Sequence, residues 1–169
     1  AGLFILAEAP FRQGDYLLLP SGKRGRVTRI GMRTTRMLTA DEVEIIIPNS
    51  HMATSQICNE SGGPREMERV CIPISVAYGT DIDEARRILV EVAAEVPGVV
   101  QDDTLHCSTV HFEAMADSGL ALLLKVWILR PELQLSVIDQ LNTRVYKRLN
   151  QEGIEIPYPK QDVFLYKKN

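Results

Sequence analysis

Three short runs of strand-forming residues follow one another with almost no connecting chain. They cover residues 24–30, 33–39 and 43–47. In the last run Val43, Ile45 and Ile47 alternate with Glu44 and Ile46, which gives the strand one apolar face. A chain that reverses so often within so few residues suits a small, tightly bent sheet. Glycines at positions 25 and 31 permit the bends and the close backbone approach that such a sheet requires.

Two more strand-like runs, at residues 16–19 and 56–59, flank this segment. A turn-rich stretch of Ser, Gly and Pro at residues 60–65 then breaks the pattern. We therefore predict a five-stranded SH3- or Sm-like β barrel for residues 12–62.

After this break the periodicity predicts the order β-α-β-β-α-β. Alternating Val70, Ile72, Ile74 and Val76 indicate a strand, and Thr80, with Asp83 three residues on, has the spacing of a helix cap. Two strands follow at 106–116 and 120–128, and Pro131 opens a second amphipathic helix. This order predicts a ferredoxin-like domain for residues 66–157, so the fold class is mixed α+β.

The tail, residues 158–169, differs from the rest. Two prolines lead into a short strand that is apolar on both faces and has little chain left to cover it. Partner subunits are the simplest cover, and we expect oligomerisation through Val163, Phe164, Leu165 and Tyr166.

Charge is distributed unevenly. The net charge is −3, yet the first 65 residues carry a surplus of base, and no acidic residue interrupts a basic cluster that favours anionic partners. This basic cluster consists of Lys23, Arg24, Arg26, Arg29, Arg33 and Arg36. The three cysteines are odd in number and widely spaced, which indicates a reduced cytoplasmic setting with thiols used as small apolar residues. No run reaches the roughly 20 apolar residues needed to span a bilayer.

No catalytic constellation is visible. His106 and His111, placed on one strand, would point to opposite faces and could not chelate a metal together. Asp81 and Asp83 open a helix, where acids are expected in any case. No Gly-rich phosphate loop and no nucleophile elbow occur. We expect no enzyme activity, no catalytic residue, no metal site and no cofactor.

Two alternative functions remain open. Sm-like barrels and ferredoxin-like folds both bind RNA, but Tyr16 is the only aromatic residue between positions 16 and 59, and single-stranded bases are held largely by aromatic stacking. The expected strand at 120–128 is aliphatic where an RNA-binding signature should stand. A small-molecule-sensing domain of the ACT type would explain only the second half.

Five segments in order resemble the small-conductance mechanosensitive channel family (MscS-like). They are Pro-Phe-Arg-Gln-Gly-Asp at 10–15, residues 25–36, Glu-Ile-Ile-Ile-Pro-Asn-Ser at 44–50, Tyr-Gly-Thr-Asp at 78–81 and Ile-Pro-Tyr-Pro at 156–159. The resemblance implies that residues 1–11 end a pore-lining transmembrane helix, whose upstream part is cut away. It further implies a barrel beneath the membrane, a ferredoxin-like vestibule wall, and terminal strands closing a parallel β barrel between subunits.

The same resemblance implies a function. Channels of this family are homoheptamers in the cell inner (plasma) membrane that open under tension and release ions and small osmolytes on hypo-osmotic shock. This region would be cytoplasmic, the protein would contact membrane lipid through the missing transmembrane helices, and it would bind no nucleic acid. Pro48 and Asn49 match the β-domain position that contacts the pore helix and influences inactivation. We assign the basic cluster a membrane-proximal or intersubunit role.

Overall fold

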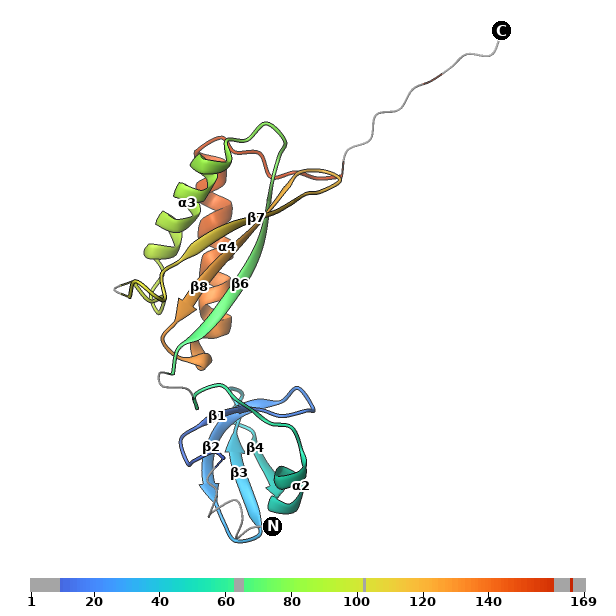
Figure 1. Ribbon diagram of the computed structural model, residues 1–169, viewed down its shortest axis with the longest axis vertical. Helices are drawn as coiled ribbons and strands as arrows, with labels where there is room; N and C mark the ends of the chain where they lie inside the picture. Colours follow the sequence, from blue (N-terminus) through green and yellow to red (C-terminus); the bar gives the residue numbers. More distant parts are fainter. Residues whose placement is uncertain (1–9, 63–65, 102, 160–164, 166–169) are drawn as a thin grey trace. The chain divides into compact units, whose positions relative to one another are not determined.

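The computed structural model describes residues 10–62, 66–101, 103–159 and 165 of a mixed α+β chain (Figure 1). The chain forms two compact units. The first comprises the residues up to Glu68 together with Ile128–Gln134, and the second contains Arg69–Trp127 and the chain after Gln134.

The first unit is built on one antiparallel sheet of five strands in the order β4-β3-β2-β1-β5. The strands are β1 Tyr16–Leu18, β2 Arg24–Ile30, β3 Thr34–Leu38, β4 Glu44–Pro48 and β5 Cys58–Asn59. Each lies within two residues of a run expected from the sequence. β2 packs closely against β3 at Gly25, where a Cβ would come within 2.6 Å of the Leu38 carbonyl oxygen.

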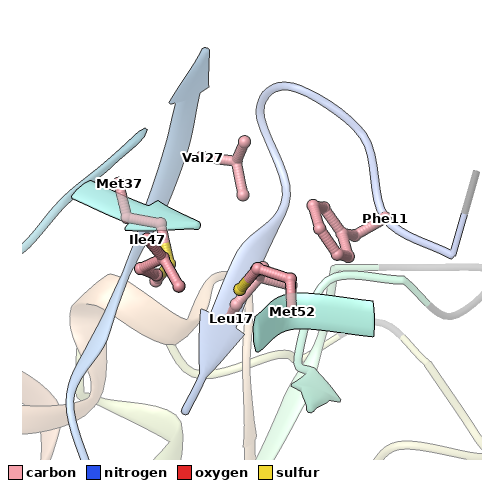
Figure 2. Close-up of a cluster of buried hydrophobic side chains, with 6 residues drawn as sticks. All are labelled: Phe11, Leu17, Val27, Met37, Ile47 and Met52. Carbon is pink, nitrogen blue, oxygen red and sulfur yellow. The ribbon is translucent and has the colours of Figure 1, made fainter. Parts of the chain in front are cut away.

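A compact apolar core fills the concave side of this sheet (Figure 2). It gathers one residue from each of β1, β2, β3 and β4 with one that precedes the sheet and one from α2. These are Leu17, Val27, Met37, Ile47, Phe11 and Met52. The expected apolar face of the third run is confirmed at Ile45 and Ile47, whereas Val43 precedes the strand and is 55 % exposed.

β2 carries a one-residue register shift at Thr28. Before it, Val27 lies opposite Met37; after it, Arg29 lies opposite Arg36. Thr28 Oγ1 donates a hydrogen bond to the Arg36 carbonyl oxygen, 3.2 Å away. Such a bulge turns the following side chains to the other face of the strand.

A short helix follows β4 directly, where the sequence suggested only a turn. This helix, α2, spans Asn49–Thr54 and has no side-chain cap. Its first residue, Asn49, and its fourth, Met52, are buried. The six-residue segment is too short for a helical period to stand out, which explains why the sequence did not predict it.

The second unit has a three-stranded sheet in the order β6-β8-β7, covered on one face by two helices (Figure 1). Its elements are β6 Glu68–Val76, α3 Ile82–Ala94, β7 Thr109–Met115, β8 Leu120–Ile128 and α4 Gln134–Gln151. The 3-10 turn η1, Pro131–Leu133, lies between β8 and α4 and belongs to the first unit. β6 buries the expected Val70, Ile72, Ile74 and Val76, and its alternate residues are exposed.

Two details differ from expectation. α3 is capped by Asp81 rather than by Thr80: the Asp81 carboxylate accepts from the backbone N–H groups of Asp83 and Glu84 at 2.9 and 3.2 Å. The last strand of the expected β-α-β-β-α-β order is absent from the described residues. The segment after α4 instead meets the end of β6 through a backbone hydrogen bond from the Ala77 N–H to the Glu155 carbonyl at 2.8 Å.

The β7–β8 turn lies against the chain that leaves this unit. A Cβ at Gly119 would come within 2.5 Å of the Val76 carbonyl oxygen and 2.7 Å of Pro157 Cγ. Tyr78 donates a hydrogen bond from its hydroxyl to the Ala116 carbonyl oxygen, at 2.7 Å, beside the same turn.

The tail residues expected to form the subunit interface are only partly described. Val163, Phe164 and Tyr166 lie outside the described residues, and Leu165 is 92 % exposed. The three cysteines, expected as thiols used as small apolar residues, are all free and exposed.

Candidate functional site

The turn between β2 and β3, residues Gly31–Arg33, is held rigidly by Asn49. The backbone N–H of Asn49 donates to the Arg33 carbonyl, and its Nδ2 donates to the Gly31 carbonyl, each at 2.8 Å. The Thr35 hydroxyl donates to Asn49 Oδ1, also at 2.8 Å. Within the turn, the Gly31 N–H donates to the Thr34 carbonyl. This network joins the start of α2 to the neighbouring hairpin.

Burial makes this network costly to break. Asn49 is 1 % exposed and Thr35 is 0 % exposed, so loss of either partner would leave a buried polar group unsatisfied. Pro48, the last residue of β4, is exposed and lies opposite Thr34 in the sheet. Of the two residues expected to contact a pore helix, Pro48 is therefore at the surface, and Asn49 bonds inward through both of its side-chain polar atoms.

The basic cluster is divided by its acidic partners. Arg24, at the start of β2, pairs with Glu60 at 2.8 Å and with Glu68 at 3.0 Å, and its third partner is the side-chain oxygen of Gln134. Burial raises the pKa of the Glu68 carboxyl above its usual range, although Arg24 opposes the rise. Arg24 is thus occupied by an ion-pair network inside the first unit.

Arg26, two residues further on, is also occupied. Its Nε donates to Glu132 Oε1 at 2.7 Å, and another of its nitrogens donates to the Gly14 carbonyl. The Arg24 and Arg26 guanidinium groups lie 5.8 and 5.9 Å from the centroid of the Tyr16 ring. Burial raises the pKa of the Tyr16 phenol. The Arg26–Glu132 contact joins residues 106 positions apart, and no local sequence signal indicates it.

The remaining members of the basic cluster are less well paired. In the described part of the chain, Lys23, Arg29 and Arg33 form no ion pair, and Arg36 has only Glu44, at 3.4 Å on the exposed surface. Arg29 and Arg36 line a polar hollow of about 210 Å³ together with Gly31 and Thr34. Two members of the basic cluster, Arg24 and Arg26, are therefore held by acidic partners, whereas Lys23, Arg29 and Arg33 form no ion pair with the described residues and Arg36 forms a weak one.

The two histidines considered as metal ligands lie in different places. His106 precedes β7 instead of lying on it, its Nδ1 is 2.7 Å from Asp103 Oδ2, and its ring meets Trp127 edge-on at 4.6 Å. His111 lies on β7. Over the described ranges, no group of three or more His, Cys, Asp or Glu side chains is placed to hold a metal ion.

None of the helices in the described ranges is both long and apolar enough to cross a bilayer.

Comparison with known proteins identifies the family. Residues 1–62 match the model described as the mechanosensitive ion channel β-domain, and residues 70–156 match the model of the MscS C-terminal region. The resemblance found in the sequence motifs is confirmed. This family is one of ion channels and not of enzymes.

Two curated relatives extend the match over nearly the whole chain. The small-conductance mechanosensitive channel MscMJ of Methanocaldococcus jannaschii is 32 % identical, covering 100 % of this chain and 47 % of its own length. The small-conductance mechanosensitive channel of Edwardsiella ictaluri is also 32 % identical, covering 98 % of this chain and 56 % of its own. The chain therefore spans about half the length of these relatives.

The fold is shared with solved structures. The structure of Helicobacter pylori MscS in its closed state superposes with a TM-score of 0.82 at 23 % identity, covering 99 % of this chain and 64 % of that one. The two family models match the chain one after the other, and the solved structure shares its fold. The chain is therefore a member of the MscS family of mechanosensitive ion channels.

Proposed function

We propose that this chain is the cytoplasmic part of a channel that opens under membrane tension and releases ions and small osmolytes on hypo-osmotic shock. The observation that carries the proposal is the ordered match of the β-domain model and the C-terminal model over residues 1–62 and 70–156. The test is a patch-clamp recording of the full-length protein in a membrane patch under suction. Tension-activated current supports the proposal, and an electrically silent protein that reaches the membrane contradicts it.

The finer architecture is part of this proposal. We assign residues 1–11 to the end of the pore helix, 12–62 to an Sm-like β domain, 66–157 to a ferredoxin-like vestibule domain and 158–169 to a strand of an intersubunit barrel. The five-stranded antiparallel sheet supports the second assignment, and the order β6-β8-β7 with two helices supports the third. The hydrogen bond from the Ala77 N–H, just after β6, to the Glu155 carbonyl supports pairing of the last segment with β6 as a fourth strand.

Assembly and location are also proposed rather than observed. We expect a homoheptamer in the inner (plasma) membrane, with contacts to lipid through transmembrane helices upstream of this chain. Exposure of 92 % at Leu165 leaves an apolar side chain in need of cover. Sedimentation should show a concentration-dependent oligomer that Leu165→Asp, or deletion after Pro159, shifts toward monomer. A stable oligomer insensitive to both changes would place the main interface in the β domain.

Asn49 supplies the most direct link between this structure and gating. Because its side chain holds the β2–β3 turn, we infer that it sets the shape of the β-domain surface offered to the pore helix. In patch-clamp recordings, Asn49→Ala should change the rate at which the open channel inactivates under sustained tension. Ser50→Ala, an exposed neighbour on the same helix, is the matched control and should inactivate as the wild type does. Equal inactivation in all three proteins would contradict this role.

RNA binding gains no support from the structure. Base stacking requires accessible aromatic rings. In the described part of the β domain, residues 10–62, the two aromatic side chains are Phe11 and Tyr16, which are 4 % and 5 % exposed. Neither can receive a base.

A further inference from the structure

Two arginines on neighbouring strands lie directly opposite each other. Arg29 on β2 and Arg36 on β3 are partners in the antiparallel register. Like charges in this position repel each other and destabilise a sheet, so the arrangement calls for an explanation. Their own chain supplies little compensation: Arg29 has no ion pair within the described residues, and Arg36 has only the long contact to Glu44 at 3.4 Å.

The bulge at Thr28 creates this pair. With the register that holds at Val27 and Met37, Arg29 would lie opposite Thr35, whose side chain is fully buried. The extra residue instead turns Arg29 outward, beside Arg36. The bulge in β2 therefore places the Arg29 guanidinium group on the surface, next to that of Arg36, instead of on the core side of the sheet.

The space around the two arginines is a formed hollow. It measures about 210 Å³, and Gly31 and Thr34 complete its lining. Two of its lining residues are fixed by hydrogen bonds: the Gly31 N–H donates to the Thr34 carbonyl and Asn49 Nδ2 donates to the Gly31 carbonyl, both at 2.8 Å. A preorganised site loses less conformational entropy on binding than two arginines on a mobile loop would.

We propose that the Arg29–Arg36 hollow binds a phosphate oxyanion. A guanidinium group presents a planar fork of N–H donors that matches two oxygens of a phosphate, and two such forks facing one space suit a single dianion or phosphodiester. Thr34 also lines the hollow, and its hydroxyl is of the kind that can add a neutral donor. The anion removes the repulsion between the two arginines, and Glu44 competes with it for Arg36.

This chemistry has two possible sources. The phosphate belongs either to the headgroup of an anionic lipid or to a small phosphate compound in solution. Anion binding by Arg29 and Arg36 depends on this chain alone, and it does not require the proposed channel function to be correct.

Titration with inorganic phosphate at constant ionic strength tests the site. NMR signals of the Arg29 and Arg36 Nε–H groups should shift together and saturate. Each of Arg29→Gln and Arg36→Gln should raise the dissociation constant roughly ten- to a hundredfold, the range expected for a lost charge-assisted hydrogen bond. Glu44→Gln should lower it, because the competing carboxylate is gone. The amide spectrum of each variant shows that it is folded.

The matched control is Arg33→Gln. Arg33 is exposed on the same turn but does not line the hollow, so its loss removes the same charge without touching the site. We expect less than about a threefold change, the size of a screened long-range effect. If Arg33→Gln weakens binding as much as Arg29→Gln, the anion is held by the overall positive charge of the turn and not by the hollow, and the proposal is wrong.

Lipid vesicles distinguish the two sources of the phosphate, a lipid headgroup and a compound in solution. Sedimentation with phosphatidylglycerol vesicles, compared with phosphatidylcholine vesicles, measures binding to an anionic headgroup. If the vesicles bind with the same ranking of variants and inorganic phosphate does not saturate, the site takes a lipid phosphate. If phosphate saturates and the vesicles do not bind, it takes a soluble one. If neither binds, or if single-stranded RNA binds more tightly and all arginine variants weaken it equally, the proposal is overturned.

Discussion

The two ends of β2 carry arginines in opposite electrostatic settings. At its start, Arg24 and Arg26 are surrounded by Glu60, Glu68 and Glu132, drawn from distant parts of the chain. Around its end, Arg29 lies opposite Arg36 on β3, and the ion pair there is the weak contact of Arg36 with Glu44. A count of charges along the sequence makes these ends look alike. The structure shows that the arginines at one end are held by acids of the first unit, whereas those at the other end have few partners among the described residues.

The strongest test of this difference is the removal of Arg24. Arg24→Met should destabilise the protein by about 3 kcal/mol, because it leaves Glu60 and Glu68 poorly solvated and without their cation. Arg29→Met, at the other end, should change the free energy of unfolding by less than about 0.5 kcal/mol. Urea unfolding at neutral pH, with equal m-values, measures both. Equal losses would show that the two ends do not differ.

A second test addresses the turn beneath the available end. Asn49→Ala should cost about 2 kcal/mol, since the buried Thr35 hydroxyl and the Gly31 carbonyl both lose their partner. Amide hydrogen exchange should accelerate in the β2–β3 turn while protection at Arg24 and Arg26 stays unchanged. Faster exchange throughout β2 would mean that the two ends form one cooperative element.

A third test uses pH. Burial raises the pKa of Glu68 above the usual 4.5 more than Arg24 lowers it. The folded protein then holds this proton more tightly than the unfolded chain, so the contribution of Glu68 to stability falls as the pH rises from about 4.5 to the raised value. Glu68→Gln should remove this fall, and Glu44→Gln should not. Urea midpoints between about pH 4 and pH 7 compare the three proteins, and parallel curves would contradict the assignment.

The smallest expected effect is the coupling between Arg36 and Glu44. Both side chains are nearly half exposed and their closest atoms are 3.4 Å apart, so a double-mutant cycle should give less than about 0.5 kcal/mol. A coupling above about 1 kcal/mol would show that Arg36 is already satisfied by its own chain and is not available to an anion.

Much of the fold could be predicted because periodicity reports burial directly. The alternating Val70, Ile72, Ile74 and Val76 are buried, and the expected amphipathic helix after Pro131 appears as α4 with one buried face. The choice between Thr80 and Asp81 as a cap could not be predicted, because both side chains can accept the hydrogen bonds and only the backbone path decides between them.

The candidate site was harder to predict, for physical reasons. Asn49 was found through a motif, but its buried partners depend on how α2 meets the β2–β3 turn. The Arg29–Arg36 pair depends on a bulge, and a bulge at Thr28 leaves no mark in a pattern of alternating residues. The acids that occupy Arg24 and Arg26 come from positions 60, 68 and 132, which are contacts of the tertiary fold.

The missing side chain at Gly119 has a consequence for how this chain can diverge. Because Pro157 Cγ occupies the place next to it, even a methyl group there would push aside the segment that leads to the tail. Gly119→Ala therefore changes the path of the chain at Pro157 without altering any residue of the tail itself. Any side chain at position 119 must displace Pro157 or the Val76 carbonyl, so this position offers a way to redesign how residues 152–157 leave the domain.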